Sequence, residues 1–171
     1  ALGGTVPRER ALVIMKDSRI GTYGAAALFI SQLLRWQALV FLPLSLALIV
    51  LVSSHAAARA GAVSLMASLP YVRDTDDSKS KPIAQELSGA ALVIALLLGI
   101  LPVAIFAALF QEYFALLTVA VMSVVVVRIY CAYWFKKRLG GYTGDTLGCT
   151  EQFGEIVFLL AACAMIHISR L

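Results

Sequence analysis

Residues 16–42 read KDSRIGTYGAAALFISQLLRWQALVFL, a short polar segment that leads directly into a long apolar one. The polar part, Lys16–Gly24, holds two cations, one anion and two glycines. Charged groups are costly to bury in hydrocarbon, so we expect this segment to face water or a substrate. The apolar part approaches the roughly 20 residues that a helix needs to cross a bilayer. The boundary therefore predicts a membrane-spanning helix that starts at a polar surface.

The whole chain is too apolar for an ordinary soluble domain. Of its 171 residues, 61% are hydrophobic and 14% are charged, and the mean hydropathy is +0.89. Soluble domains average about 45–50% apolar and about 25% charged residues. The three cysteines form no CxxC pair, so they indicate neither a disulfide framework nor a zinc site. We expect an all-α fold, a polytopic transmembrane helical bundle.

Apolar runs and prolines divide the chain into one short helix and about five spanning helices. The short helix begins at Pro7 and cannot span, so we expect it to lie at the membrane interface. The spanning helices are expected at about 22–42, 43–69, 82–110, 113–135 and 149–168, with a kink at Pro102. We treat residues 1–171 as a single transmembrane domain.

Basic residues gather on one side of this topology. Five spans place the N-terminal segment and the loops at 71–81 and 136–148 on the same side. These segments carry ten of the fourteen Lys and Arg residues, namely Arg8, Arg10, Lys16, Arg19, Arg73, Lys79, Lys81, Lys136, Lys137 and Arg138. By the positive-inside rule this face of the multi-pass protein is cytoplasmic. The rule explains the net charge of +4, so we expect no nucleic-acid partner.

The first polar segment offers groups that bind phosphate. Lys16 and Arg19 could neutralise a phosphate or diphosphate, and backbone amides near Gly21 and Gly24 could add donors at the start of a helix. The alternative interpretation is a positive-inside anchor with a glycine turn. Asp17, placed between the two cations, favours a functional role over simple anchoring.

A second polar segment, Gly140–Gly148, reads GGYTGDTLG and lies on the same predicted face. Its glycines permit close approach of the backbone to a ligand. Asp145, opposite a cationic cluster, suits Mg²⁺, which takes one or two carboxylates together with substrate phosphate oxygens. The alternative is that Thr143, Asp145 or Thr146 caps the following helix. Capping and metal binding do not exclude each other.

Two further carboxylates, Glu151 and Glu155, lie four residues apart and share one helix face. Glu155 lies inside an apolar stretch, where a carboxylate needs a partner. Arg59 and Arg128 are the candidate partners, with Arg128 expected in a structural ion pair and Arg59 open to a ligand among small residues. Arg35 and Glu112 are expected to extend toward the opposite interface.

Three stretches together resemble the cobalamin synthase family, the adenosylcobinamide-GDP ribazoletransferases. They are ERALVIMKDSRIGTYG at 9–24, AAARAGAVSLMASLPYVR at 56–73 and KKRLGGYTGDTLGCTEQFGEIVFLL at 136–160. The resemblance covers essentially the whole chain. It implies an Mg²⁺-dependent, multi-pass enzyme of the cell inner membrane that joins adenosylcobinamide-GDP to α-ribazole, or to its 5′-phosphate, and releases GMP. The lipid bilayer, other corrin-pathway enzymes and a second copy of the chain are the further partners that it suggests.

The resemblance also suggests roles for individual residues in displacement at a diphosphate. Lys16, Asp17, Arg19 and Asp145 are the expected catalytic residues, with Asp17, Asp145 and Glu155 as expected metal ligands. Substrate contacts are expected from Arg59, Ser18, Gly21, Gly24, Thr143 and Gly144.

The family carries an Asp-rich motif upstream of the segment that matches residues 1–4, and the resemblance implies that this motif supplies the main metal ligands. Those ligands would come either from residues before Ala1 or from elsewhere. Two alternatives remain at this point. A CDP-alcohol phosphotransferase-like enzyme would use similar chemistry on a lipid, but its tightly spaced acidic motif is not found here. A transporter or scaffold subunit would also contain charged spans, although the polar groups of this chain gather at one face.

Overall fold

The computed structural model describes residues 6–17, 19–72 and 88–169. Five helices in these ranges are long and apolar enough to cross a membrane, which confirms the predicted polytopic bundle. They are α2 (Thr22–Phe41), α3 (Leu44–Met66), α5 (Gly89–Leu109), α6 (Phe114–Leu139) and α7 (Gly144–Ser169). The predicted short N-terminal helix is α1 (Arg8–Lys16), and a 3₁₀ turn, η1 (Gln111–Tyr113), joins α5 to α6.

Prolines and small polar residues set several helix boundaries. Pro43 precedes the first residue of α3, and the Ser88 hydroxyl accepts a hydrogen bond from the Ala91 amide to cap α5. The predicted start of this helix at residue 82 lies outside the described residues. Pro102 lies inside α5 without ending the helix.

Helix α3 lies at the centre of the packing, between α7 on one side and α5 on the other. Close contacts between small residues bring these helices together. A Cβ atom on Gly154 of α7 would lie 3.1 Å from Ala58 Cβ of α3, and one on Gly99 of α5 would lie 2.3 Å from Ala60 Cβ. Small residues at such crossings let membrane helices approach closely. The core between α3, α6 and α7 includes Leu46, Val50, Leu117, Ala120 and Phe158.

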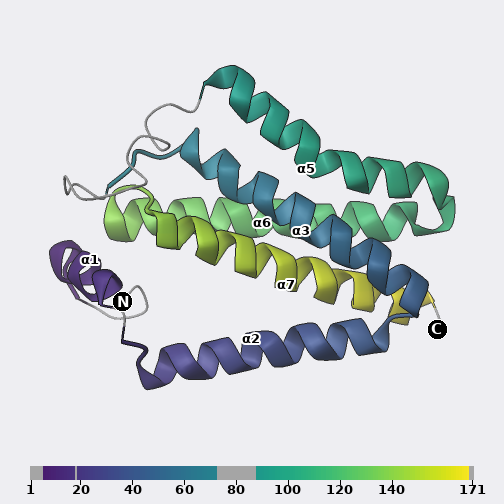
Figure 1. Ribbon diagram of the computed structural model, residues 1–171, viewed down its shortest axis with the longest axis horizontal. Coiled ribbons are helices and arrows are strands. Elements are labelled where there is room, and N and C mark those ends of the chain that lie inside the picture. Colours follow the sequence, from purple (N-terminus) through teal and green to yellow (C-terminus); the bar gives the residue numbers. More distant parts are fainter. Residues whose placement is uncertain (1–5, 18, 73–87, 170–171) are drawn as a thin grey trace.

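Successive spanning helices run in opposite directions, so the polar segments meet at one end of the bundle (Figure 1). Helix α1, the start of α2, the end of α6 and the start of α7 all lie there. We call this the basic end, because Lys136, Lys137 and Arg138 lie in the last turn of α6. The Arg138 guanidinium donates a hydrogen bond of 3.5 Å to the Val6 carbonyl, and so links the segment before α1 to α6.

Candidate functional site

The first polar segment is internally paired in the structure. Arg19 Nη2 lies 2.8 Å from Asp17 Oδ2, and the Arg19 amide donates a hydrogen bond of 3.0 Å to Asp17 Oδ1. The side-chain hydrogen bonds from Arg19, helped by that amide, hold the pKa of Asp17 below its ordinary value. The Arg19 side chain is 88% exposed, so the pair faces outward at the basic end.

The two glycines that follow this pair differ in their surroundings. Gly21 is the N-cap of α2, and no atom lies within 4 Å of the position that a Cβ would take there. At Gly24 the nearest atom is Ile20 Cγ1, at an ordinary contact distance of 3.4 Å. A ligand could therefore approach the first amides of α2 beside Gly21. Ser18, the remaining predicted contact of this segment, lies outside the described residues.

The second polar segment has a defined turn. Gly140 ends α6 with a φ of 78°, a left-handed conformation that glycine adopts without strain. At Gly141 a Cβ would lie 2.1 Å from the Pro70 carbonyl oxygen, so only glycine allows the two loops to approach this closely. The Tyr142 amide donates to the Pro70 carbonyl, and the Val72 amide donates to the Tyr142 carbonyl. These bonds form a short parallel bridge between the two loops.

Helix α7 begins at Gly144, so the predicted start at residue 149 was wrong. The reason is a reciprocal pair of bonds between buried threonines. The Thr146 hydroxyl accepts from the Thr143 amide at 2.8 Å, while the Thr143 hydroxyl accepts from the Thr146 amide at 3.3 Å. This pair satisfies amides at the helix start in the manner of a capping box. The capping interpretation of Thr143 and Thr146 is confirmed.

The early start of α7 brings Asp145 into the same helix as Glu151 and Glu155. Asp145 lies exposed in the first turn, whereas Glu151 and Glu155, four residues apart, share another side of the helix further along. No atom occupies the space within 4 Å of a Cβ at Gly144 or Gly148. The three carboxylates span about 15 Å along the axis of α7, at 1.5 Å per residue.

Further along α7, Glu155 lies at the centre of a buried cluster. Its carboxylate side chain is 4% exposed; Oε2 lies 3.0 Å from Arg35 Nη2 of α2. The other oxygen, Oε1, lies 2.7 Å from His55 Nδ1 of α3, although this contact is not aligned as a hydrogen bond. Arg35 Nη2 also donates to the Gln152 carbonyl at 3.3 Å. Three helices thus converge on one carboxylate.

The two partners predicted for this carboxylate, Arg59 and Arg128, were therefore wrong. Arg59 pairs with Glu151, one turn nearer the basic end, with 3.2 Å between Arg59 Nε and Glu151 Oε1. Arg128 donates instead to Ser64 of α3 and to Ser68 just after that helix. The separate expectation that Arg35 extends to the opposite interface was also wrong, because Arg35 pairs with Glu155 inside the bundle. Sequence reasoning also missed His55, whose spacing of four residues from Arg59 is the signal that could have identified it.

Antiparallel packing of α3 and α7 explains this register. Moving four residues from His55 to Arg59 along α3 reaches the level of Glu151, four residues before Glu155 on α7. The contact between Gly154 and Ala58 fixes the two helices at this register. The two contacts, Arg59–Glu151 and His55–Glu155, lie one turn apart along α3 and α7. We call this pair of contacts the ladder; it leads from the basic end into the bundle. Its open side exposes 61% of the Arg59 side chain and 43% of that of His55.

Comparison with known proteins assigns the chain to a family. The family model for cobalamin-5-phosphate synthase matches residues 1–163. This chain belongs to the cobalamin-5-phosphate synthase family. No solved structure matches it.

The cobalamin-5-phosphate synthase match is supported by curated relatives named adenosylcobinamide-GDP ribazoletransferase. The chain is similar to that of Leptothrix cholodnii, at 43% identity over 93% of this chain and 61% of the relative. It is 42% identical to the protein of Shewanella piezotolerans over 93% of this chain and 60% of the relative. The protein of Vibrio cholerae is 39% identical over 97% of this chain and 62% of the relative. The chain thus spans about three fifths of the length of these relatives.

Within this member of the cobalamin-5-phosphate synthase family, the predicted site residues fall into two groups. Asp17, Arg19 and Gly21 lie near the start of α2. Thr143, Gly144 and Asp145 lie at the start of α7, with Arg59 and Glu155 along the ladder. Both groups lie at or lead from the basic end (Figure 1), so the expected common face is confirmed. Helix α1 approaches the second segment through Arg8, which lies beside Gly140.

Proposed function

We propose that this protein is the membrane transferase that joins adenosylcobinamide-GDP to α-ribazole, or to α-ribazole 5′-phosphate. The products are adenosylcobalamin, or its 5′-phosphate, and GMP. The observation that carries the proposal is the family match over residues 1–163, together with relatives that bear this enzyme's name. The active face is the basic end, which we place on the cytoplasmic side of the inner membrane by the positive-inside rule.

The substrate diphosphate is anionic, and the ladder offers a positioned cation for it. Arg59 Nε lies 3.2 Å from Glu151 Oε1, and the Arg59 side chain is 61% exposed, so a ligand can reach the guanidinium from the open side. A guanidinium fixed in this way presents a planar fork to phosphate oxygens. Glu151 therefore positions Arg59, and Lys16 and Arg19 supply further positive charge at the same end. Gly21, Gly24, Thr143, Gly144 and Ser18 complete the proposed substrate contacts.

Mg²⁺ is part of the proposal. Among residues 6–17, 19–72 and 88–169, no three His, Cys, Asp or Glu side chains gather as a metal site of their own. Mg²⁺ is often held by one or two carboxylates, with water and substrate phosphate completing its shell. Asp145, exposed in the first turn of α7, fits such a partial site, and Asp17 is the second proposed ligand. A bound Mg²⁺ would offset the negative charge of the diphosphate.

Glu155 was also an expected metal ligand, and the structure does not test that role. Both of its oxygens already face Arg35 and His55, at 3.0 and 2.7 Å. Asp17 is also paired, through hydrogen bonds from Arg19 to both of its oxygens, but its side chain is 40% exposed, whereas that of Glu155 is buried. We therefore limit the proposed ligands to the two aspartates and assign Glu155 to holding three helices together. In this assignment it fixes the register that places Glu151 beside Arg59.

The decisive assay is GMP release by the reconstituted protein, supplied with adenosylcobinamide-GDP and α-ribazole, with Mg²⁺ or with EDTA. Corrin product is measured in parallel. We expect metal-dependent, stoichiometric formation of both products. Arg59→Met should lower the rate about 100-fold, the usual scale for losing one donor to developing charge. Asp145→Asn should lower it similarly, whereas Glu112→Gln, at the opposite end of the bundle, should retain full activity.

Two results would count against the proposal. Wild-type activity in both Arg59→Met and Asp145→Asn would remove the ladder and the start of α7 from the mechanism. Absence of GMP from this chain, and also from a chain extended to the length of its relatives, would reject the transferase assignment.

A further inference from the structure

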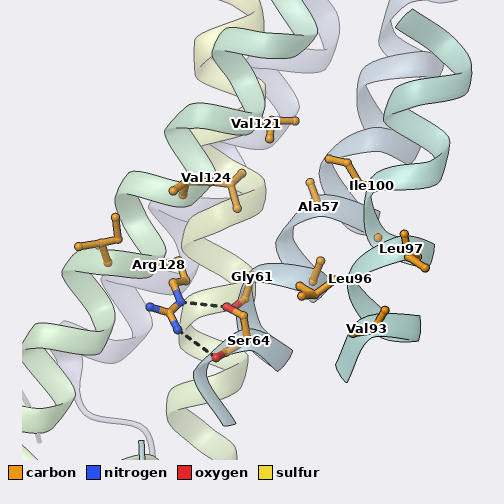
Figure 2. A pocket seen from close by; sticks show the side chains of 14 residues that line it. Ala57, Gly61, Ser64, Val93, Leu96, Leu97, Ile100, Val121, Val124 and Arg128 are labelled. Atoms are coloured by element: carbon orange, nitrogen blue, oxygen red, sulfur yellow. Dashed lines mark hydrogen bonds between the residues drawn. The ribbon is translucent and has the colours of Figure 1, made fainter. Parts of the chain in front are cut away.

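A second feature lies on the other side of α3 from the ladder. Helices α5 and α6 meet at η1 and diverge toward the basic end (Figure 1). Small residues of α3, including Ala57, Ala60 and Gly61, line the space between them. The resulting groove has a volume of about 740 Å³ and walls of Val, Leu and Ile side chains from α5 and α6 (Figure 2).

The groove opens toward the surface that the bilayer would cover. Val93 and Leu97 on α5 and Val125 and Ile129 on α6 line it and are exposed. In a spanning bundle such side chains face acyl chains. From Val93 to Ile100 the wall extends about 10 Å along the helix, at 1.5 Å per residue. Its shape and chemistry therefore suit part of a hydrocarbon chain.

One cation lies at the end of this groove. Arg128 Nε donates to the Ser64 hydroxyl and Nη2 donates to the Ser64 carbonyl, both at 2.9 Å (Figure 2). Nη2 also donates to the Ser68 hydroxyl at 2.6 Å. These partners belong to the last turn of α3 and the residues just after it, so the guanidinium is level with the end of a spanning helix. No carboxylate is among the contacts of Arg128 in the described part of the chain.

We propose that this groove binds one anionic phospholipid of the bilayer. The phosphate contacts the Arg128 guanidinium, and one acyl chain lies along the groove past Gly61 and Ala57. Charge complementarity favours this occupant, because Arg128 has no carboxylate partner among the described residues. Its guanidinium lies at the level where lipid headgroups begin, and the apolar groove extends from it. Ser64 and Ser68 hold the guanidinium in place. The proposal is independent of the transferase assignment.

The test is native mass spectrometry of the protein released from nanodiscs of equal phosphatidylglycerol and phosphatidylcholine. We expect one phosphatidylglycerol to be retained in preference to phosphatidylcholine. Arg128→Gln should reduce that retention about fivefold, the effect of one basic residue near an anionic surface. Arg128→Lys should retain most of it. Lys137→Gln removes one exposed positive charge from the same helix and should leave retention unchanged.

A second pair of variants tests whether the chain occupies the groove. Val93→Trp fills the mouth of the groove and should lower phosphatidylglycerol retention, whereas Val126→Trp, an exposed residue of α6 outside the groove, should not. Equal retention by wild type and Arg128→Gln, or equal retention of the two lipids by wild type, would overturn the proposal. Loss in Arg128→Gln with none in Val93→Trp would overturn the placement of the acyl chain. Displacement of the lipid by α-ribazole 5′-phosphate would identify the groove as a substrate site instead.

Discussion

At the scale of single residues, Glu155 has the most constrained position in the candidate site. Its side chain is nearly inaccessible and lies about 16 Å along the helix from the start of α7. One carboxylate oxygen contacts Arg35 of α2, and the other contacts His55 of α3. Removing one member of a buried pair leaves the other desolvated and uncompensated, which costs more than the pair itself contributes. The arrangement therefore makes α2, α3 and α7 depend on one carboxylate.

We predict that Glu155→Gln destabilises the protein by about 3 kcal/mol, the lower end for a broken buried pair because His55 is partly exposed. Unfolding in mixed micelles, followed by the fluorescence of Trp36 next to Arg35, measures this loss. Glu112→Gln is the control: this exposed residue should change stability by less than about 0.5 kcal/mol. Equal unfolding curves for Glu155→Gln and wild type would show that the buried cluster does not hold the helices together.

The residue scale is also where sequence reasoning succeeded only in part. A carboxylate inside an apolar run required a partner, and the structure supplies one. The identity of that partner depended on which helix faces pack together, and the sequence of one helix does not contain this information. Arg35 belongs to neither of the two polar segments. Its role follows only from the packing of α2 beside α7.

At the scale of helices and loops, the tight turn at Gly141 joins two parts of the basic end. The loop after α3 and the loop before α7 are bridged through Tyr71 and Tyr142, whose rings also meet edge to face at 5.4 Å between centroids. Burial, with a smaller contribution from Tyr71, raises the pKa of Tyr142. The bridge requires a glycine at position 141 as well as its two backbone hydrogen bonds, because a Cβ there would overlap the Pro70 carbonyl.

We predict that Gly141→Ala lowers stability by about 2 kcal/mol, since an added Cβ would overlap the Pro70 carbonyl and force the loops apart. The same thermal or denaturant measurement applied to Gly144→Ala provides the matched control. Gly144 opens α7 with no atom near the position of its Cβ, so that change should be within about 0.5 kcal/mol of wild type. A neutral Gly141→Ala would mean that the bridge contributes nothing to the fold.

The five spanning helices were predictable from the apolar runs, because backbone N–H and C=O groups in lipid must form hydrogen bonds within a helix. The start of α7 was not predictable in this way, because the glycine- and threonine-rich sequence GGYTGDTLG at 140–148 contains no apolar run. Thr143 and Thr146 supplied the cap, and the alternative interpretation of the segment had identified that possibility. The hydrogen bonds between Thr143 and Thr146 set the start of α7. Such local polar bonds give a weaker sequence signal than an apolar run does.

At the scale of the whole molecule, the alternating spans place the polar segments together, as the number of spans predicted. The direction of the bundle in the membrane is a separate prediction from the basic residues. We expect a cysteine at Lys137 to react with a membrane-impermeant maleimide only after cells are opened. A cysteine at Glu112, at the other end, should react in intact spheroplasts.

The unmodified chain serves as the blank for this labelling, because Cys131, Cys149 and Cys163 lie within the spans. Labelling of Lys137→Cys in intact spheroplasts, without labelling of Glu112→Cys, would reverse the assigned orientation. It would also move the proposed active face to the outside.

The ion-pair ladder has a consequence for biosynthesis. Arg59 leaves the ribosome about ninety residues before Glu151, its partner. At roughly 5–20 residues per second, α3 waits about 5–18 s before the matching carboxylates are made. During that interval a span bearing a cation resides at the insertion machinery without compensation, at a penalty of up to about 3 kcal/mol for a central arginine. The largely apolar first half of α3, from Leu44 to Val52, can hold this helix in the membrane until α7 is made.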